Sequence, residues 1–338
     1  MIIQIHTNED LIGLGESSPN GGGAESERSA KGIIKVVEQL TPVLLGSDPF
    51  QIGPLFQKMD KVVPGCLWAK AGVDIALHDL MGKAAKEPTS SLLGGCFRNK
   101  LPIEFPLTER RNSPEETGEA AAKAAKAGYS FIELKGGTDS DLDAGRVRAV
   151  REAIGGKPRL KVDINSGYKS ADEAIKSIKK MEKFGVDFVE DPLPESDVTG
   201  MAKVTAAVDV KIVGDEVAET LPMLVENVVR RKAADAVHLK ICKGGIAATV
   251  KMIEVAEAAG IVPIVGASYS FGVGIAAVHQ VAASMATLHR PDHYGQPFFV
   301  EDVLAAPLGE SRGYVAVSQK PGLGVELDEE KLKMLRTK

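Results

Sequence analysis

The chain has 338 residues, of which 44% are hydrophobic and 26% charged, as expected for a folded protein with a sizeable core. Its formal net charge is −5 and it has no long basic run, which excludes the electrostatic footprint of a nucleic-acid-binding protein. No apolar run reaches the roughly 18 residues of a membrane helix and no signal peptide is evident, so we expect a cytoplasmic protein without membrane contact. Three scattered cysteines, Cys66, Cys96 and Cys242, argue against a disulfide framework and a thiolate metal site.

The first hundred residues combine a strand hairpin with helices. Alternating side chains predict two strands, IIQIHT and NEDLIGLGE, and apolar residues at helical spacing predict helices over about 29–45, 54–59 and 67–83. The glycine-rich SPNGGGAESE lacks the Lys-Ser/Thr ending of a P-loop, so we interpret it as a mobile loop. Residues 1–100 are therefore predicted to form a small α+β capping domain.

From Leu101 onward, short apolar strands alternate with amphipathic helices. Strands are predicted over about 103–106, 131–135, 159–163, 186–190, 211–215, 235–240, 262–266 and 298–301. Helices are predicted over about 115–127, 141–154, 172–184, 198–207, 219–232, 246–259 and 273–287. This order predicts an α/β fold in which residues 101–302 form a (β/α)7β TIM-like barrel that carries the active site. Residues 303–338 cannot extend the parallel barrel, and we expect them to pack back on the capping domain.

Five charged residues stand at the ends of five successive predicted strands. They are Lys135, Asp163, Glu190, Asp215 and Lys240. The steps between them, 28, 27, 25 and 25 residues, match one strand, one helix and two loops. All five are therefore expected on one rim, the rim where barrel enzymes carry their catalytic groups.

The chemistry of this ring follows from its charges. Three converging carboxylates raise one another's pKa values because their negative charges repel. A divalent cation bound between them offsets this repulsion. A ligand set made only of oxygen indicates Mg²⁺ or Mn²⁺ and not zinc. A lysine whose pKa is lowered by the cation and a dry site can remove the proton α to a carboxylate, and a second lysine opposite can return it. The alternative interpretation is a structural network in which the acids pair with the lysines.

Motifs in a fixed order extend this interpretation over nearly the whole chain. They are ALHDLMGK, LLGG, LKVDINSGY, VEDPLP, GDE, LKICKGG and PGLGVEL. In these motifs the chain resembles the enolase superfamily, and within it the muconate-lactonising subgroup of the mandelate racemase/muconate lactonizing enzyme family. The resemblance implies a capping domain, a homo-oligomer and one Mg²⁺. It also implies metal ligands Asp163, Glu190 and Asp215, acid/base residues Lys135 and Lys240, and supporting residues Asn165 and Glu216.

One departure from the family pattern lies on the second barrel strand. The subgroup usually has Lys-x-Lys there, whereas this chain has Glu133, Leu134 and Lys135. Side chains two apart on a strand share a face, so we expect Glu133 to keep Lys135 protonated. Lys240 would then be the better base.

Two further departures concern the substrate. Ser270 stands where the family often has a glutamate, and no acid lies near Ser268 and Ser270 to pair with a substrate ammonium group. This favours neutral or acylated substrates over dipeptides. The chain also begins at what resembles the family's second strand, without the first strand and the loop that covers the substrate. Either the pocket is more open, or a segment such as SPNGGGAE supplies the loop, or the natural start lies upstream.

These observations predict an isomerase that acts on a small carboxylate through an enediolate. The substrate would be an N-substituted amino acid or related carboxylate that is racemised or epimerised, or a muconate-type acid that is cycloisomerised. Two alternatives remain open. A lyase that dehydrates a hydroxy acid would use the same intermediate, and a catalytically silent binding relative would explain the missing loop and Glu133.

Overall fold

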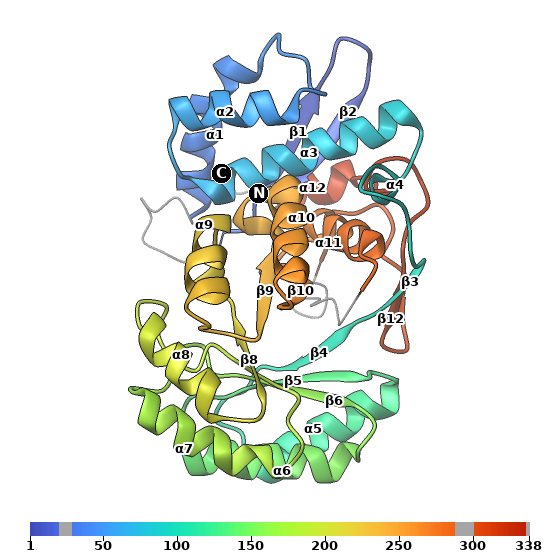
Figure 1. Cartoon of the computed structure of the whole chain (residues 1–338). Helices are drawn as coiled ribbons and strands as arrows, with labels where there is room; N and C mark the ends of the chain where they lie inside the picture. Colours follow the sequence, from blue (N-terminus) through green and yellow to red (C-terminus); the bar gives the residue numbers. More distant parts are fainter. Residues whose placement is uncertain (20–28, 288–300, 336–338) are drawn as a thin grey trace.

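The computed structural model describes residues 1–19, 29–287 and 301–335. Figure 1 shows a helical part that contains the N-terminal hairpin and, beside it, a curled parallel sheet with helices on its outer side. Most of the glycine-rich segment SPNGGGAESE and of the predicted strand 298–301 lies outside the described residues. Within the described part of the chain, no helix is both long and apolar enough to cross a membrane.

The N-terminal part is a hairpin packed on helices, as the sequence predicts. Strand β1 (Ile2–His6) pairs antiparallel with β2 (Ile12–Glu16). The helices are α1 (Ala30–Leu44), α2 (Ile52–Val62), α3 (Leu67–Ala85) and α4 (Thr89–Leu92). Helix α3 is buried on all sides, which is typical of a helix enclosed between two layers. A Cβ atom on Gly15 would lie 1.9 Å from the backbone oxygen of Gly72, so only glycine permits this close packing of β2 on α3.

The sheet has seven parallel strands in chain order, from β4 to β10. They are β4 (Glu104–Leu107), β5 (Phe131–Lys135), β6 (Arg159–Asp163), β7 (Phe188–Glu190), β8 (Lys211–Gly214), β9 (Ala236–Lys240) and β10 (Val262–Gly266). The connecting helices are α5 (Pro114–Ala127), α6 (Ser140–Ile154), α7 (Ala171–Glu182), α8 (Val198–Ala207), α9 (Leu221–Met223), α10 (Gly245–Ala258) and α11 (Gly272–Ser284). Each of these strands ends within two residues of its predicted position. In the described residues, this curled sheet of parallel strands forms a half-barrel.

Local sequence explains where the helices of the sheet layer begin. Ser113 and Glu116 form a reciprocal capping box at the start of α5, and Asp139, Ser170 and Asp197 cap α6, α7 and α8 through their side chains. Each cap satisfies backbone N–H groups that have no partner in the first helical turn. These capping signals explain why the predicted helix starts agree with the structure.

One predicted helix, over 219–232, is wrong in type. A 3₁₀ turn (Glu216–Ala218) precedes this segment, which contains the three-residue α9 and a π-helix (Leu224–Arg230). Its buried side chains, Leu224 and Val228, are four residues apart. A spacing of four fits both an α-helix and a π-helix, so the apolar pattern could not distinguish them.

The C-terminal segment returns to the N-terminal part. Strand β12 (Tyr314–Ala316) pairs antiparallel with β11 (Glu310–Ser311) and with β3 (Lys100–Pro102), and a short helix, α12 (Glu329–Leu335), follows. The buried carboxylate of Asp79 on α3 accepts hydrogen bonds from the backbone N–H groups of Leu14 and Leu323, at 2.8 and 2.7 Å. Asp79 therefore ties the C-terminal segment to α3 and the hairpin.

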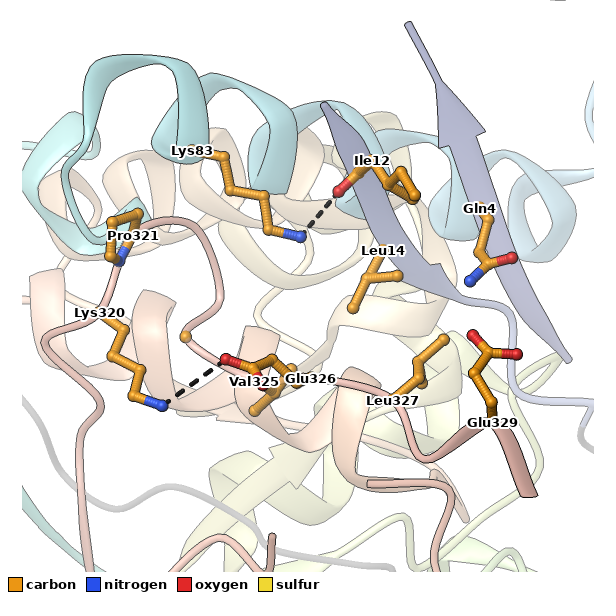
Figure 2. Close-up of a pocket in the computed structure, with 11 residues that line it drawn as sticks. Gln4, Ile12, Leu14, Lys83, Lys320, Pro321, Val325, Glu326, Leu327 and Glu329 are labelled. Atoms are coloured by element: carbon orange, nitrogen blue, oxygen red, sulfur yellow. Dashed lines mark hydrogen bonds and ion pairs between the residues drawn. The ribbon is translucent and has the colours of Figure 1, made fainter. Parts of the chain in front are cut away.

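A cavity of about 430 Å³ lies between the hairpin and this C-terminal segment. Figure 2 shows Ile12, Leu14 and Lys83 on one side of it and Val325 and Leu327 on the other. Lys83 donates to the backbone oxygen of Ile12 at 2.7 Å. The division of the chain into domains 1–100, 101–302 and 303–338 stays a prediction.

Candidate active site

The parallel register brings the predicted charged residues to one rim. Lys135 is opposite Asp163, and Asp163 is opposite Glu190. Asp215 directly follows β8 and Lys240 ends β9. The spacing found in the sequence therefore corresponds to neighbouring strand ends.

A cavity of about 210 Å³ opens at this rim. It is smaller than the cavity of Figure 2, but it gathers most of the ionisable groups that the sequence singled out. Its lining residues are Thr108, Arg110, Lys135, Asn165, Glu190, Glu216, His238, Lys240, Ala267, Ser268 and Tyr269.

Lys135 is held between two carboxylates. Its Nζ lies 2.6 Å from Oε1 of Glu133 and 2.6 Å from Oδ2 of Asp163. Asn165 donates to both oxygens of Asp163, from its backbone N–H and its side-chain amide, each at 2.8 Å. Burial lowers the pKa of Lys135, but Glu133 and Asp163 raise it further, so the pKa stands above its usual range. Burial raises the pKa of Asp163 to about 6 although Lys135 opposes the shift.

Lys240 also lines the cavity and has a matching carboxylate partner. Its Nζ donates to Oδ2 of Asp215, and Lys243 donates to Oδ1 of the same carboxylate at 2.7 Å. Burial lowers the pKa of Lys240, whereas Asp215 and Glu190 raise it well above its usual range. Burial raises the pKa of Asp215, but Lys240 and Lys243 outweigh burial and hold it below its usual range. The protein's own groups thus favour the ammonium form of both Lys135 and Lys240.

Lys161 and His238 were missed by the sequence analysis. Lys161 Nζ lies 2.6 Å from both Glu133 and Glu190 and 3.4 Å from Glu104, and His238 Nδ1 lies 2.9 Å from Glu190. All five side chains are buried. The signal was present, because Lys161 and His238 each precede a predicted site residue by two positions and therefore share its face of the strand.

Two overlapping groups in the described residues could hold a metal ion. Glu190, Asp215 and His238 form one, and Asp191, Asp215 and Glu216 form the other, with one ligand atom from each residue within 4.8 Å of the others. Carboxylate oxygens dominate both groups, which suits a hard cation such as Mg²⁺. The structure therefore brings the predicted ligands Glu190 and Asp215 together.

Asp163, the third predicted ligand, belongs to neither group. It is next to Glu190 in the strand register, but its carboxylate binds Lys135 and Asn165. Asp191 was not predicted. Burial, together with the carboxyl group of Glu216, raises its pKa well above the usual range, and its carboxylate accepts the backbone N–H of Asp215 at 3.0 Å.

The two predicted serines after β10 have different positions. Ser268 lines the cavity, whereas the Oγ of Ser270 lies 2.5 Å from the Oγ of Ser18, beyond the hairpin strand β2. The sequence analysis also missed Glu16, at the end of β2. Its buried carboxylate accepts hydrogen bonds at 2.7 Å from two backbone N–H groups at the start of α11. Glu16 and Ser270 therefore join the hairpin to the loop that carries Ser268.

Two family models match most of the chain. The model described as "Mandelate racemase / muconate lactonizing enzyme, N-terminal domain" matches residues 1–94. The model described as "Enolase C-terminal domain-like" matches residues 116–331. Together they cover the hairpin, the helical part and the parallel sheet.

Characterised relatives and solved structures agree with this assignment. N-succinyl-L-Arg/Lys racemase of Bacillus cereus is 31% identical over 99% of this chain and 89% of the relative; its crystal structure has a TM-score of 0.91 and covers 100% of this chain and 90% of that one, at 30% identity. A chloromuconate cycloisomerase of Cupriavidus necator is 32% identical over 98% of this chain and 90% of the relative. The crystal structure of a muconate cycloisomerase from Pseudomonas fluorescens has a TM-score of 0.92 at 30% identity, over 100% of this chain and 94% of that one. The chain therefore belongs to the mandelate racemase/muconate lactonizing enzyme family of the enolase superfamily and is an isomerase of its muconate-lactonizing subgroup.

Proposed function

We propose that this enzyme removes the proton α to a carboxylate with the help of a divalent cation, and so racemises, epimerises or cycloisomerises a small carboxylate. The observation that carries this proposal is the arrangement of Lys135 and Lys240. They end β5 and β9, line one cavity, and have acidic strand ends between them. Two amines that flank a bound carbon atom suit proton removal on one side and proton return on the other.

Three carboxylates, those of Asp163, Glu190 and Asp215, are proposed to hold the cation, which we infer to be Mg²⁺ or Mn²⁺. The oxygen-rich groups around Glu190 and Asp215 support this assignment. When bound, the cation would supply the positive charge that stabilises an enediolate. Asp163 and Asp215 now bind the two lysines, so cation binding by these carboxylates would free the amines for chemistry.

The lysines are proposed to have unequal roles. Lys240 acts as the base, because its carboxylate partner Asp215 would be shared with the cation. Lys135 acts as the acid, because Glu133 is 2.6 Å from its Nζ and favours the ammonium form. Lys161 and His238 contact Glu190 at 2.6 and 2.9 Å and position it as a ligand.

We also propose roles for the predicted eighth strand, for the segments outside the sheet and for the other predicted site residues. The strand predicted over 298–301 would complete the curled sheet as a (β/α)7β barrel, and the segments 1–100 and 303–338 would cap it. Asn165 would orient Asp163, and Ser268 would contact the substrate. Glu216 would support the cation site and Ser270 the substrate loop. The homo-oligomer and the cytoplasmic location stay predictions.

Proton exchange in D₂O tests the proposed reaction. A library of α-substituted carboxylates is incubated with enzyme and Mg²⁺, and deuterium at the α-carbon is followed by NMR and chiral chromatography. A racemase or epimerase places deuterium in both stereoisomers of the recovered substrate, a cycloisomerase gives a lactone, and the alternative lyase gives a keto acid. Absence of both exchange and Mg²⁺ binding at millimolar concentrations would instead support the silent binding relative.

The two lysines can be separated in the same assay. The substrate is the stereoisomer whose α-proton faces Lys240. With this stereoisomer, Lys135→Met should keep the α-proton exchange that Lys240 catalyses but lose conversion to the other stereoisomer. Lys240→Met should lose exchange of that stereoisomer. If both variants retained full interconversion, the assigned roles would be wrong.

A further inference from the structure

His238 is a nitrogen donor in a site for which the sequence predicts only oxygen ligands. It precedes Lys240 by two residues on β9, so both side chains share one face of the strand. The residue is buried, and it also lines the active-site cavity. The chemistry of this imidazole therefore bears on which cation the site holds.

The imidazole belongs to one of the two groups of possible metal ligands. Glu190, Asp215 and His238 are all buried, and each contributes one ligand atom within 4.8 Å of the others. Nδ1 of His238 is 2.9 Å from Oε1 of Glu190. Two donors at right angles, each about 2.1 Å from an octahedral ion, stand about 3.0 Å apart. The observed separation therefore fits two adjacent ligands of one ion.

Buried lysines hold one oxygen of each carboxylate in this group. Oε2 of Glu190 is 2.6 Å from Nζ of Lys161, and Oδ1 of Asp215 is 2.7 Å from Nζ of Lys243. Both lysines are buried, so these contacts fix the orientation of the two carboxylates. The oxygens that remain for a cation beside the imidazole are Oε1 of Glu190 and, once the proposed base has left it, Oδ2 of Asp215.

A nitrogen donor changes which cation such a site prefers. Mg²⁺ is bound through oxygen, whereas imidazole suits first-row transition metals. In a site of mixed nitrogen and oxygen donors, affinity rises from Mn²⁺ through Fe²⁺ to Co²⁺. Carboxylates suit Mn²⁺ as well as Mg²⁺. Two carboxylates and one imidazole therefore favour a divalent transition metal over Mg²⁺.

We propose that His238 is a direct ligand of the cation and biases the site toward divalent transition metals, Mn²⁺ among them, over Mg²⁺. The inference rests on the proposed function, because the cation is the one that would stabilise the enediolate. His238 adds one nitrogen donor to the oxygens of Glu190 and Asp215. A neutral imidazole donates the lone pair of one ring nitrogen and keeps its proton on the other.

A positioning role makes a different prediction. An imidazole that only forms a hydrogen bond with Glu190 would orient this carboxylate for any cation. Loss of the imidazole would then weaken Mg²⁺ and Mn²⁺ binding equally, and no histidine nitrogen would contact the ion. A direct ligand instead places a nitrogen nucleus next to the ion, and its loss weakens Mn²⁺ binding more than Mg²⁺ binding.

Pulsed EPR of Mn²⁺ bound to the whole chain tests this contact without any turnover. Wild type should show the hyperfine coupling of a directly bound ¹⁴N nucleus, and ¹⁵N-labelling of the histidines should replace it with a ¹⁵N coupling. His238→Asn should lose the coupling, and in calorimetry its preference for Mn²⁺ over Mg²⁺ should fall at least roughly tenfold. The asparagine amide can still donate to Glu190, so the variant removes the ring nitrogen and keeps a hydrogen-bond donor. His6→Asn, at an exposed histidine of β1, is the matched control and should keep both properties.

Three results would overturn the inference. They are Mn²⁺ bound to wild type without a histidine coupling, a coupling that survives in His238→Asn, and an unchanged preference for Mn²⁺ over Mg²⁺ in that variant. If His238→Asn does not fold, the ¹⁵N-labelled wild type still decides whether a histidine binds the ion.

The proposed function is tested separately by α-proton exchange. Exchange without the coupling would reject His238 as a ligand and leave the proposed function standing. Coupling without exchange of any carboxylate would reject the proposed function and leave the ligand assignment standing. Absence of Mn²⁺ binding at millimolar concentrations would overturn the ligand assignment.

Discussion

Replacing Lys161 with methionine removes the cation that three buried glutamates share. Lys161 Nζ lies 2.6 Å from Glu133 and from Glu190 and 3.4 Å from Glu104, and its side chain is 1% exposed. Burial raises the pKa of Glu133 and of Glu190, but nearby cations, Lys161 among them, hold both pKa values well below the usual range. Glu133 and Glu190 are therefore ionised in the folded protein, and their repulsion in Lys161→Met would be strong.

The size of the effect follows from burial. Removing one partner of a buried ion pair costs about 3–5 kcal/mol, whereas an exposed pair contributes about 0–1 kcal/mol. Lys203 and Asp172 provide an exposed pair at the same separation, 2.6 Å, with side chains 59% and 84% exposed. We expect Lys161→Met to lose about 3–5 kcal/mol of unfolding free energy and Lys203→Met less than about 1 kcal/mol.

Urea unfolding in the presence of EDTA measures both variants without a bound divalent cation. Far-UV circular dichroism follows the whole fold, and the fluorescence of the single tryptophan, buried Trp68 on α3, follows the N-terminal part. Adding Glu133→Gln to Lys161→Met should recover part of the loss, because it removes one of the repelling charges.

A loss below about 1 kcal/mol in Lys161→Met, equal to that in Lys203→Met, would refute the reasoning. It would mean that water or protonation reduces the repulsion between the glutamates at little cost in free energy. The contribution of these ion pairs to stability would then depend on distance and not on burial. No recovery in the double variant would show that the loss comes from lost packing of the lysine stem.

Three further predictions concern stability and metal binding. Burial raises the pKa of Glu16 from its ordinary 4.5 to about 7, so the folded state binds more protons than the unfolded state between these pH values and stability falls as the pH rises through them. Glu16→Gln should flatten this slope in melting experiments between about pH 5 and pH 8; parallel slopes would contradict it. Asp79→Ala should cost at least about 2 kcal/mol in urea unfolding, because the buried N–H groups of Leu14 and Leu323 lose their acceptor; a loss below about 1 kcal/mol would argue against this tie. Glu190→Gln should weaken Mg²⁺ binding at least roughly tenfold in calorimetry, and an unchanged Kd would remove Glu190 from the ligand set.

The sequence by itself determined most of the helices and strands, and the edge of the sheet at which the charged residues lie. Alternation with period two and helical spacing are local properties, and capping residues such as Ser113 and Asp139 mark helix starts within a few positions. The regular spacing from Lys135 to Lys240 placed five charged groups on one edge because each βα unit has nearly the same length. The contact of Glu133 with Lys135 was also accessible, since both lie on one face of one strand.

Only the tertiary structure decided which charges meet across strands and between distant segments. Whether Asp163 contacts Glu190 or Lys135 depends on sheet curl and side-chain direction, which no one-dimensional pattern contains. Glu16 reaches the start of α11 across more than 250 residues of chain, and Arg110 comes from a turn that Arg146 holds in place. Such contacts depend on how the hairpin, the turns and the sheet pack in three dimensions, and packing of this kind brings together residues that carry no shared signal in the sequence.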